Sequence, residues 1–244
     1  MRGLLLGLGL AVILAPNAWP AEKVDVALVM AADVSRSVDN EEFKLQRQGY
    51  ANAITSDRVL KAVAAGPHGE IAVCFIEWSG PDEQRIVADW TVIRDGESAR
   101  PFAKTLIEAE RSFAGRTSIS AALDVAMEVF ARSGVEAERR VIDVSGDGTN
   151  NAGRPIDQAR QSALAAGVTI NGLAIINEHP MPGFSAHTQP PEGLPEYYRR
   201  NVTGGQGSFL LVVQDFSTFG EAMIDKLVTE IASKDVPRRI AKRH

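Results

Sequence analysis

Hydrophobic residues run almost without interruption through short segments of the chain, and polar residues separate these segments. Residues 24–33, VDVALVMAAD, form such a run, which is typical of a strand covered on both faces. Similar runs predict five further strands, at residues 70–78, 85–93, 138–147, 168–176 and 207–214. The short polar turn at 79–84 favours a hairpin between the second and third strands.

Between these strands, apolar residues recur at helical spacing. The pattern predicts helices at 39–64, 97–111, 118–132, 155–166 and 216–233, and a short helix at 196–202. Asp39 and Glu42, three positions apart, predict a capping box where the first helix begins. The alternation predicts one α/β domain with three layers: a doubly wound, mostly parallel six-stranded sheet with one antiparallel edge strand. Ligands of such sheets bind beyond the carboxyl ends of the strands.

The first residues have the pattern of a secretory signal peptide, with a basic start, the apolar run GLLLGLGLAVILA and small residues after it. We assign residues 1–21 to it, although cleavage after Ala18 or after Ala21 fits equally well. The run is shorter than the ~20 apolar residues that cross a bilayer, so we expect no stable membrane span after cleavage. The predicted location is extracytoplasmic, periplasmic or secreted. The domain then covers residues 22–236, and 237–244 form a basic tail that we interpret as a solvated end.

Charge and composition exclude several functional classes. The 244 residues carry 26 Lys and Arg against 31 Asp and Glu, a formal charge of −5, which argues against binding to nucleic acid. One cysteine, Cys74, excludes an intrachain disulfide and any multi-cysteine metal site, and we expect it to be buried in its apolar strand. The four histidines show no HExxH or HxxxH pairing, which disfavours zinc hydrolases.

Oxygen-bearing side chains follow the first predicted strand. Asp33, Ser35 and Ser37 alternate along an extended segment, so their side chains can point to the same side. Carboxylate and hydroxyl oxygens suit Mg²⁺, Ca²⁺ or Mn²⁺ better than zinc. The same residues also fit an ordinary strand-to-helix turn in which Ser37 or Asp39 caps the helix.

Two later segments carry the same kind of residue. Thr117 precedes a predicted helix, where it is either a helix cap or a ligand. Asp147, followed by Gly148, comes at the end of the fourth strand, where it is either a turn residue or a ligand.

Taken in order, Asp33-x-Ser35-x-Ser37, Thr117 and Asp147-Gly148 resemble the metal-ion-dependent adhesion site (MIDAS) of von Willebrand factor A (vWA) domains. The resemblance spans about residues 24–234 and is strongest to an uncharacterised group of secreted bacterial proteins. It implies a bound Mg²⁺, with Mn²⁺ or Ca²⁺ as alternatives.

The resemblance also implies a role for each residue. The hydroxyls of Ser35 and Ser37 bind the ion directly, and Asp33 and Asp147 supply negative charge directly or through water. Thr117 binds directly in one state and through water in another. Because only two carboxylates surround the divalent ion, one open position is left for an acidic side chain of a protein partner.

Arg36 departs from the family pattern, since many members have glycine at this position. Its charge would either attract an acidic partner or lower the affinity for the ion by repulsion. We expect a solvent-facing side chain with a mild effect.

Three other features are open to two interpretations. Asp39, Glu41 and Glu42 form either a second cation site or, as we favour, a capped helix start. Asn150 and Asn151 either orient Asp147 or belong to a turn. The Pro-rich segment 177–195 is either a loop that shapes partner specificity or an excursion without a role. We interpret Asp143, inside the fourth strand, as a buried paired group rather than a ligand.

The sequence favours a metal-dependent binding module without catalysis. It contains no GxSxG, P-loop or GxGxxG motif after the first strand, so nothing in it identifies an enzyme. The alternative is a Mg²⁺-dependent hydrolase or phosphatase-like enzyme that uses the same pocket. Ser35 argues against it, because an aspartyl-phosphate phosphatase would carry a second aspartate there. A domain whose ion only stabilises the fold is the third hypothesis.

Overall fold

The computed structural model describes residues 21–176, 185–214 and 216–232. The expected signal peptide, apart from its last residue, therefore lies outside the described residues, as do the basic tail and residues 177–184 of the Pro-rich segment. None of the helices in the described ranges is both long and apolar enough to cross a bilayer.

Six strands form one sheet in the order β3-β2-β1-β4-β5-β6. Their bounds are β1 Glu22–Asp33, β2 Ile71–Trp78, β3 Gln84–Ile93, β4 Val135–Gly146, β5 Thr169–Ile175 and β6 Leu210–Val213. All neighbouring pairs are parallel except β2 and β3, which form an antiparallel hairpin at one edge. The predicted sheet, with its single antiparallel edge strand, is confirmed.

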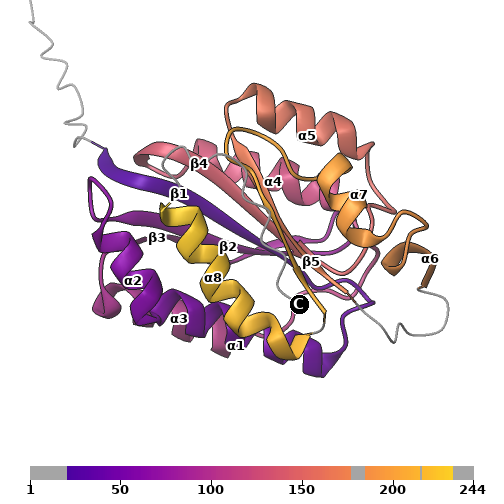
Figure 1. The fold of residues 1–244 in the computed structure, drawn as a ribbon, viewed down its shortest axis with the longest axis horizontal. Coiled ribbons are helices and arrows are strands. Elements are labelled where there is room, and N and C mark those ends of the chain that lie inside the picture. Colours follow the sequence, from indigo (N-terminus) through magenta and orange to yellow (C-terminus); the bar gives the residue numbers. More distant parts are fainter. Residues whose placement is uncertain (1–20, 177–184, 215, 233–244) are drawn as a thin grey trace, which may run out of the picture.

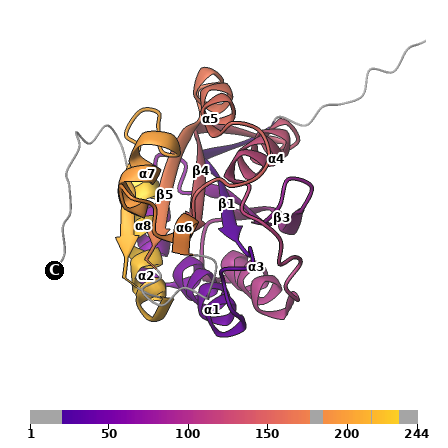
Figure 2. The same cartoon turned by 90° about the vertical axis from the view of Figure 1, so that its right-hand side faces the viewer.

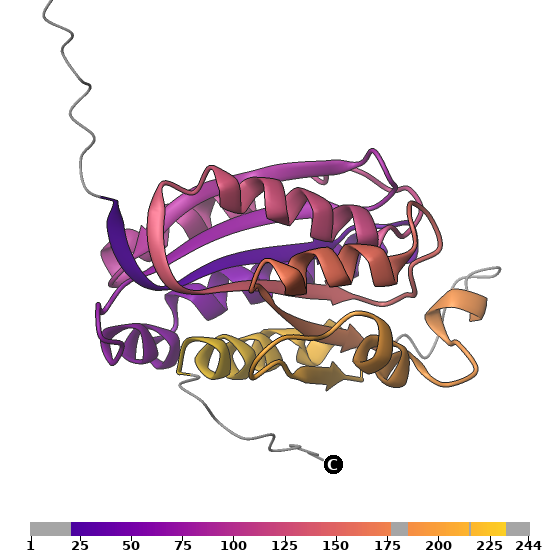
Figure 3. The same cartoon turned by 90° about the horizontal axis from the view of Figure 1, so that it is seen from above.

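Helices cover both faces of the sheet (Figures 1 and 3). One face carries α1 Asn40–Thr55, α2 Asp57–Ala64, α3 Gly96–Glu108 and α8 Phe219–Ala232, and the other carries α4 Ile119–Ala131, α5 Ile156–Ala165 and α7 Leu194–Asn201. A four-residue helix, α6 Ser185–Thr188, and a 3₁₀ turn, Phe216–Thr218, complete the described elements. Seen from the end at which β1 stops, the sheet stands between the two helical layers (Figure 2).

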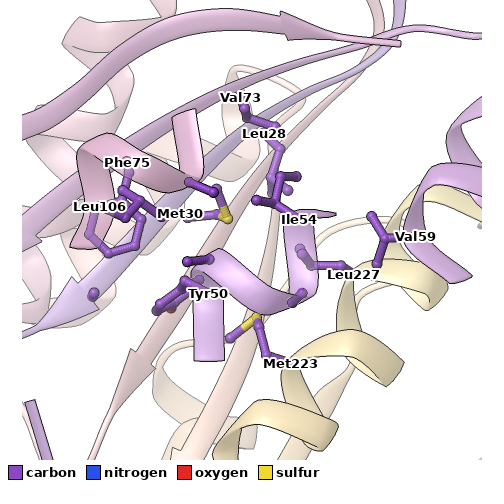
Figure 4. Close-up of a cluster of buried hydrophobic side chains, with 14 of the residues drawn as sticks. Leu28, Met30, Tyr50, Ile54, Val59, Val73, Phe75, Leu106, Met223 and Leu227 are labelled. Carbon is purple, nitrogen blue, oxygen red and sulfur yellow. The ribbon is translucent and has the colours of Figure 1, made fainter. Parts of the chain in front are cut away.

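The apolar strand residues alternate between two hydrophobic cores. Leu28 and Met30 of β1 point to the face covered by α1, where they pack with Tyr50 and Phe75 (Figure 4). Val29 and Ala31 point to the opposite face, beneath α4. Both faces of β1 are thus buried, which explains its continuous apolar sequence. Cys74 of β2 is fully buried, as expected.

The structure corrects the prediction of one helix over 39–64. Ser56 has extended backbone angles, and its side chain accepts a hydrogen bond from the Val59 amide, so α1 ends and α2 begins there. Apolar spacing continues across the break and hides it, since both helices pack on the same core. At the start of α1, the capping box between Asp39 and Glu42 is confirmed.

The Pro-rich segment is also more structured than predicted. Its described part contains α6, and α7 begins at Leu194, two residues before the predicted short helix. Pro195 occupies the first turn of α7, where its missing amide hydrogen costs no helical hydrogen bond.

A charged cluster lies buried between α8 and the sheet. Lys226 Nζ contacts Asp143 Oδ1 at 2.7 Å and Glu230 Oε1 at 2.5 Å, and all three side chains are fully buried. Asn171 Nδ2 donates a hydrogen bond to Glu230 Oε1 at 3.1 Å. Asp143 is therefore a buried paired group, as the sequence suggested.

We predict that Lys226→Ala lowers the free energy of unfolding by about 3–5 kcal/mol, because it leaves the Asp143 and Glu230 carboxylates buried without their cation. Denaturant unfolding followed by circular dichroism measures the loss. Lys104→Ala is the matched control, since its exposed pair with Glu108 contributes at most about 1 kcal/mol. Equal effects of the two substitutions would contradict this account of the cluster.

Candidate metal centre

The five residues implied as ligands come together where β1 and β4 end. Ala32 of β1 pairs with Ser145 of β4, so Asp33, the last residue of β1, and Asp147, the first residue after β4, lie at neighbouring strand ends. Thr117 lies directly before α4 and is brought to the same place by its loop.

Hydrogen bonds connect the hydroxyls and one carboxylate. Ser37 Oγ donates to Asp147 Oδ1 at 2.7 Å, and the Ser35 and Ser37 hydroxyls are 3.2 Å apart. Thr117 Oγ1 donates to Ser35 Oγ at 3.2 Å. All of these residues, and Asp33, are at most 4% exposed. The interpretation of Thr117 as a helix cap is wrong, because Ser118 caps α4.

The Asp33 carboxyl lies in an environment that opposes its ionisation. Burial, followed by the charge of Asp147, raises its pKa from 3.8 to about 8, although hydrogen bonds from Ser35 and the charge of Arg111 act in the opposite direction. Its Oδ1 accepts a hydrogen bond from the Ser35 amide at 2.7 Å. Its Oδ2 is buried and has no hydrogen-bond partner among the described residues.

These features fit a hard divalent cation. A buried carboxylate oxygen without a hydrogen-bond donor, beside a second carboxylate, is stabilised when a cation lies between them. In the described part of the chain, no group of three or more His, Cys, Asp and Glu side chains is arranged so that it could hold a metal ion. A site here therefore depends on hydroxyl as well as carboxylate oxygens, a set of donors that suits Mg²⁺, Mn²⁺ or Ca²⁺.

Gly146 makes room for this arrangement at the end of β4. A Cβ atom at this position would lie 2.7 Å from the Tyr198 hydroxyl and 2.9 Å from Asp33 Oδ2. Tyr198 is fully buried, and burial together with the charges of Asp33 and Asp147 raises its pKa well above 10. Its hydroxyl therefore remains protonated beside the two carboxyls.

A second layer of polar side chains fixes the loop after β1. Arg111 Nη2 donates to the carbonyl oxygens of Val34 and Ser35, both at 2.8 Å. Gln46 of α1 donates to the carbonyl oxygen of Asp33 at 3.1 Å. The ligand-bearing backbone is thereby held from outside the ligand set.

The segment around Arg111 is held in turn by a buried ion pair. Arg47 Nη2 contacts Glu77 Oε1 at 2.5 Å, and its Nη1 donates to the carbonyl oxygen of Leu106. Glu77 Oε2 accepts a hydrogen bond from the Ser112 amide at 2.9 Å. This pair links α1, β2 and the chain that leads towards Thr117.

Asn150 and Asn151 support the Thr117 loop. Asn151 Oδ1 accepts from the Thr117 amide at 3.0 Å, and Asn150 Oδ1 accepts from the Ser120 amide at 2.9 Å. Their side chains thus position the start of α4, which neither alternative drawn from the sequence had specified. Ser79 also supports the start of α4, because its carbonyl oxygen accepts a hydrogen bond from the Ser118 amide. The Ser79 hydroxyl in turn donates a hydrogen bond to Glu83 Oε2 at 2.5 Å.

Sequence reasoning missed Arg111, Glu77, Tyr198 and Gly146. Nothing in their local sequence separates them from ordinary surface or core residues, because their partners lie far away along the chain. Arg111 and Val34, for example, are 77 positions apart.

The sequence profile of a family described as "Protein of unknown function (DUF1194)" matches residues 23–235. The chain belongs to this family. A comparison of the DUF1194 chain with curated proteins found no match by sequence.

Solved structures with a vWA-type fold resemble this DUF1194 domain. Proximal thread matrix protein 1 from the mussel byssus matches with a TM-score of 0.62 and 18% identity over 86% of this chain and 49% of its own. A second structure of that protein, with a zinc-occupied MIDAS motif, matches with a TM-score of 0.59 and 18% identity over 86% and 48%. A von Willebrand factor type A protein from Catenulispora acidiphila matches with a TM-score of 0.59 and 16% identity over 88% and 44%.

These likenesses confirm that the DUF1194 domain has the vWA-like fold that its motifs suggested. The chain spans about half the length of these solved proteins, so their common part is the domain alone.

We predict that the metal-free protein loses stability as the pH rises from about 4 to 8. In this range the unfolded chain ionises Asp33, while the folded protein keeps it protonated, so the unfolded state binds fewer protons and gains relative stability. The decline levels off above about pH 8. Melting temperatures in EDTA at a series of pH values measure it.

Asp33→Asn should make this decline shallower, because it removes the carboxyl that ionises in the unfolded chain but stays protonated in the folded protein. An unchanged slope in Asp33→Asn would contradict the assignment of the raised pKa to Asp33.

Proposed function

We propose that this vWA-like domain binds a divalent cation, preferentially Mg²⁺, through Asp33, Ser35, Ser37, Thr117 and Asp147. Through that ion it binds an acidic group of a protein partner. The observation that carries the proposal is the buried Asp33 Oδ2, which has no hydrogen-bond partner in the described part of the chain. At the same strand ends, hydrogen bonds join the hydroxyls of Ser35, Ser37 and Thr117 to the Asp147 carboxyl.

The proposed ligands contribute different kinds of oxygen to the site. Asp33 and Asp147 supply two negative charges, and the hydroxyls of Ser35, Ser37 and Thr117 supply neutral oxygens. A divalent cation in this set is neutralised by the protein but not over-neutralised, so it supplies a Lewis-acidic position for one further anionic oxygen. Arg111 and Gln46 hold the ligand loop in place before a partner arrives.

Two further observations support this function. The mussel byssus protein of the same fold holds zinc at its MIDAS motif, so a divalent cation in this position is compatible with the fold. The N-terminal sequence has the pattern of a signal peptide, which supports a role outside the cytoplasm, where adhesive contacts with other proteins take place.

We predict that the protein binds Mg²⁺ in a calorimetric titration and that Asp33→Ala weakens binding at least about tenfold, because half of the carboxylate charge is lost. Parallel titrations with Mn²⁺, Ca²⁺ and Zn²⁺ rank the ions. Asp82→Ala, in the exposed turn between β2 and β3, is the matched control and should bind as the wild type does. Equal affinities of Asp33→Ala and the wild type would overturn the site.

The partner is tested by capture from the extracytoplasmic fraction in Mg²⁺ and in EDTA. A protein retained by the wild type in Mg²⁺, and lost both in EDTA and with Asp33→Ala, supports adhesion. A lower melting temperature in EDTA with an unchanged set of captured proteins would instead reduce the ion to a stabiliser of the fold.

A further inference from the structure

A small pocket of about 180 Å³ opens over the proposed cation site. The hydroxyl-bearing ligands Ser37 and Thr117 reach its wall, and the remaining side chains around it are those of Arg36, Arg116, Asn151 and His187. No aspartate or glutamate of the described residues lines the pocket. The two carboxylates of the site lie below it, fully buried. The side chains that line the pocket are therefore positive or neutral. The Glu83 carboxylate packs against Gly115 of the lining, where it accepts hydrogen bonds from Ser79 Oγ and the Gly80 amide.

The two arginines are exposed, and they line the same pocket from two loops that a backbone hydrogen bond joins. The Arg36 amide donates to the carbonyl oxygen of Gly115 at 3.0 Å, which ties the loop after β1 to the residue directly before Arg116. The Arg116 guanidinium donates to the carbonyl oxygen of Asn151 at 2.5 Å, and Arg36 Nε lies 3.5 Å from the carbonyl oxygen of Ala114. Within the described residues, neither guanidinium is paired with a carboxylate.

His187 closes a further side of the pocket. Its imidazole packs against Gly148, where an added Cβ atom would lie 2.7 Å from His187 Cδ2. Its carbonyl oxygen accepts a hydrogen bond from the Thr149 amide at 3.0 Å, so α6 is fastened to the loop that follows Asp147. Burial and the nearby charge of Arg116 lower the pKa of His187. Both side chains line the same pocket.

Charge then determines how many acidic groups the pocket can take. A divalent cation and the carboxylates of Asp33 and Asp147 sum to zero, and Arg36 and Arg116 add two positive charges around the opening. A single carboxylate on the cation leaves one of these charges without a counterpart. The planar guanidinium fork matches a second carboxylate, with which it forms paired charge-assisted hydrogen bonds.

We propose that the pocket recognises two neighbouring acidic side chains of one protein partner, an inference that rests on the function proposed above. The first completes the cation site, and the second binds Arg36 and Arg116. A short acidic segment of a protein fits better than a long sulfated or phosphorylated polymer. The pocket is small, and the chain as a whole carries a formal charge of −5, which repels an extended polyanion outside this opening.

Three immobilised Gly/Ser peptides test this proposal: one without acidic residues, one with a single aspartate, and one with two aspartates separated by one glycine. Binding of the full chain is measured by biolayer interferometry in Mg²⁺ and in EDTA. We expect the two-aspartate peptide to bind about tenfold more tightly than the one-aspartate peptide in Mg²⁺, as one charge-assisted contact predicts. Neither peptide should bind in EDTA.

The variants Arg36→Gln and Arg116→Gln should each reduce this tenfold difference, and together they should abolish it. Arg132→Gln is the control of equal charge change, since Arg132 is exposed at the far end of α4, about 20 Å along the helix from Thr117. It should keep the difference. Calorimetry should show that the two pocket variants still bind Mg²⁺, and circular dichroism that they remain folded.

The outcomes separate this inference from the proposed function. If both acidic peptides bind equally well in Mg²⁺, the second acidic contact is overturned while cation-dependent adhesion stands. If Mg²⁺ binds but no acidic peptide does, adhesion through the ion fails, and this inference fails with it. Binding that survives EDTA but is lost with both arginine variants would overturn the part assigned to the cation. Stronger Mg²⁺-dependent binding of dextran sulfate than of the two-aspartate peptide would overturn the protein segment as ligand.

Discussion

Two carboxylates lie buried beside each other where the parallel strands β1 and β4 end. Burying two like charges is unfavourable, and most of the surrounding structure is arranged around this constraint. Burial and the charge of Asp147 oppose the ionisation of Asp33, so the pair needs compensating positive charge or a shared proton. The fold meets the same problem elsewhere, where Asp143 and Glu230 lie buried together. There the chain itself supplies the compensating charge, the ammonium group of Lys226, as close as 2.5 Å. At the other pair, the half-buried Arg111 is held by backbone carbonyls instead, which favours an external cation.

The loops that carry the ligands gain their order from polar contacts around them. Arg111 and Gln46 bind the backbone of the loop after β1, and Asn151 binds that of the loop before α4. Because these contacts are made to backbone atoms, they fix the position of the ligand side chains without competing for their oxygens. Such prior ordering lowers the entropy that binding would otherwise lose. The arginines around the pocket belong to the same two loops, so the proposed ion and the proposed second acidic contact share one rigid frame.

Much of the fold could be predicted from the sequence, because the burial of β1 on both faces and the 3.6-residue spacing of the helices are written in local patterns. Where local and global signals agree, as at the capping box of Asp39, the prediction was confirmed. Where apolar spacing continues across a break, as at Ser56, the prediction of one helix was wrong. Both helices pack on the same core, so the spacing of their apolar residues gives no sign of the turn between them. Thr117 failed as a helix cap for a similar reason: its neighbour Ser118 offers the same hydroxyl one position later.

The sequence by itself determined the candidate chemistry. One cysteine and unpaired histidines leave oxygen atoms as the metal donors, and the order of Asp33, Ser35, Ser37, Thr117 and Asp147 resembles that of a MIDAS motif. Only the tertiary structure decided that these residues meet, that the Asp33 oxygens are buried, and that Gly146 and Tyr198 enclose them. It also decided the setting of Arg36, whose effect the sequence left open, by placing Arg116 and His187 around the same pocket. The physical reason is separation along the chain. Burial, repulsion and charge balance depend on distances in space, and these are fixed by how β1 and β4 pair rather than by neighbouring residues.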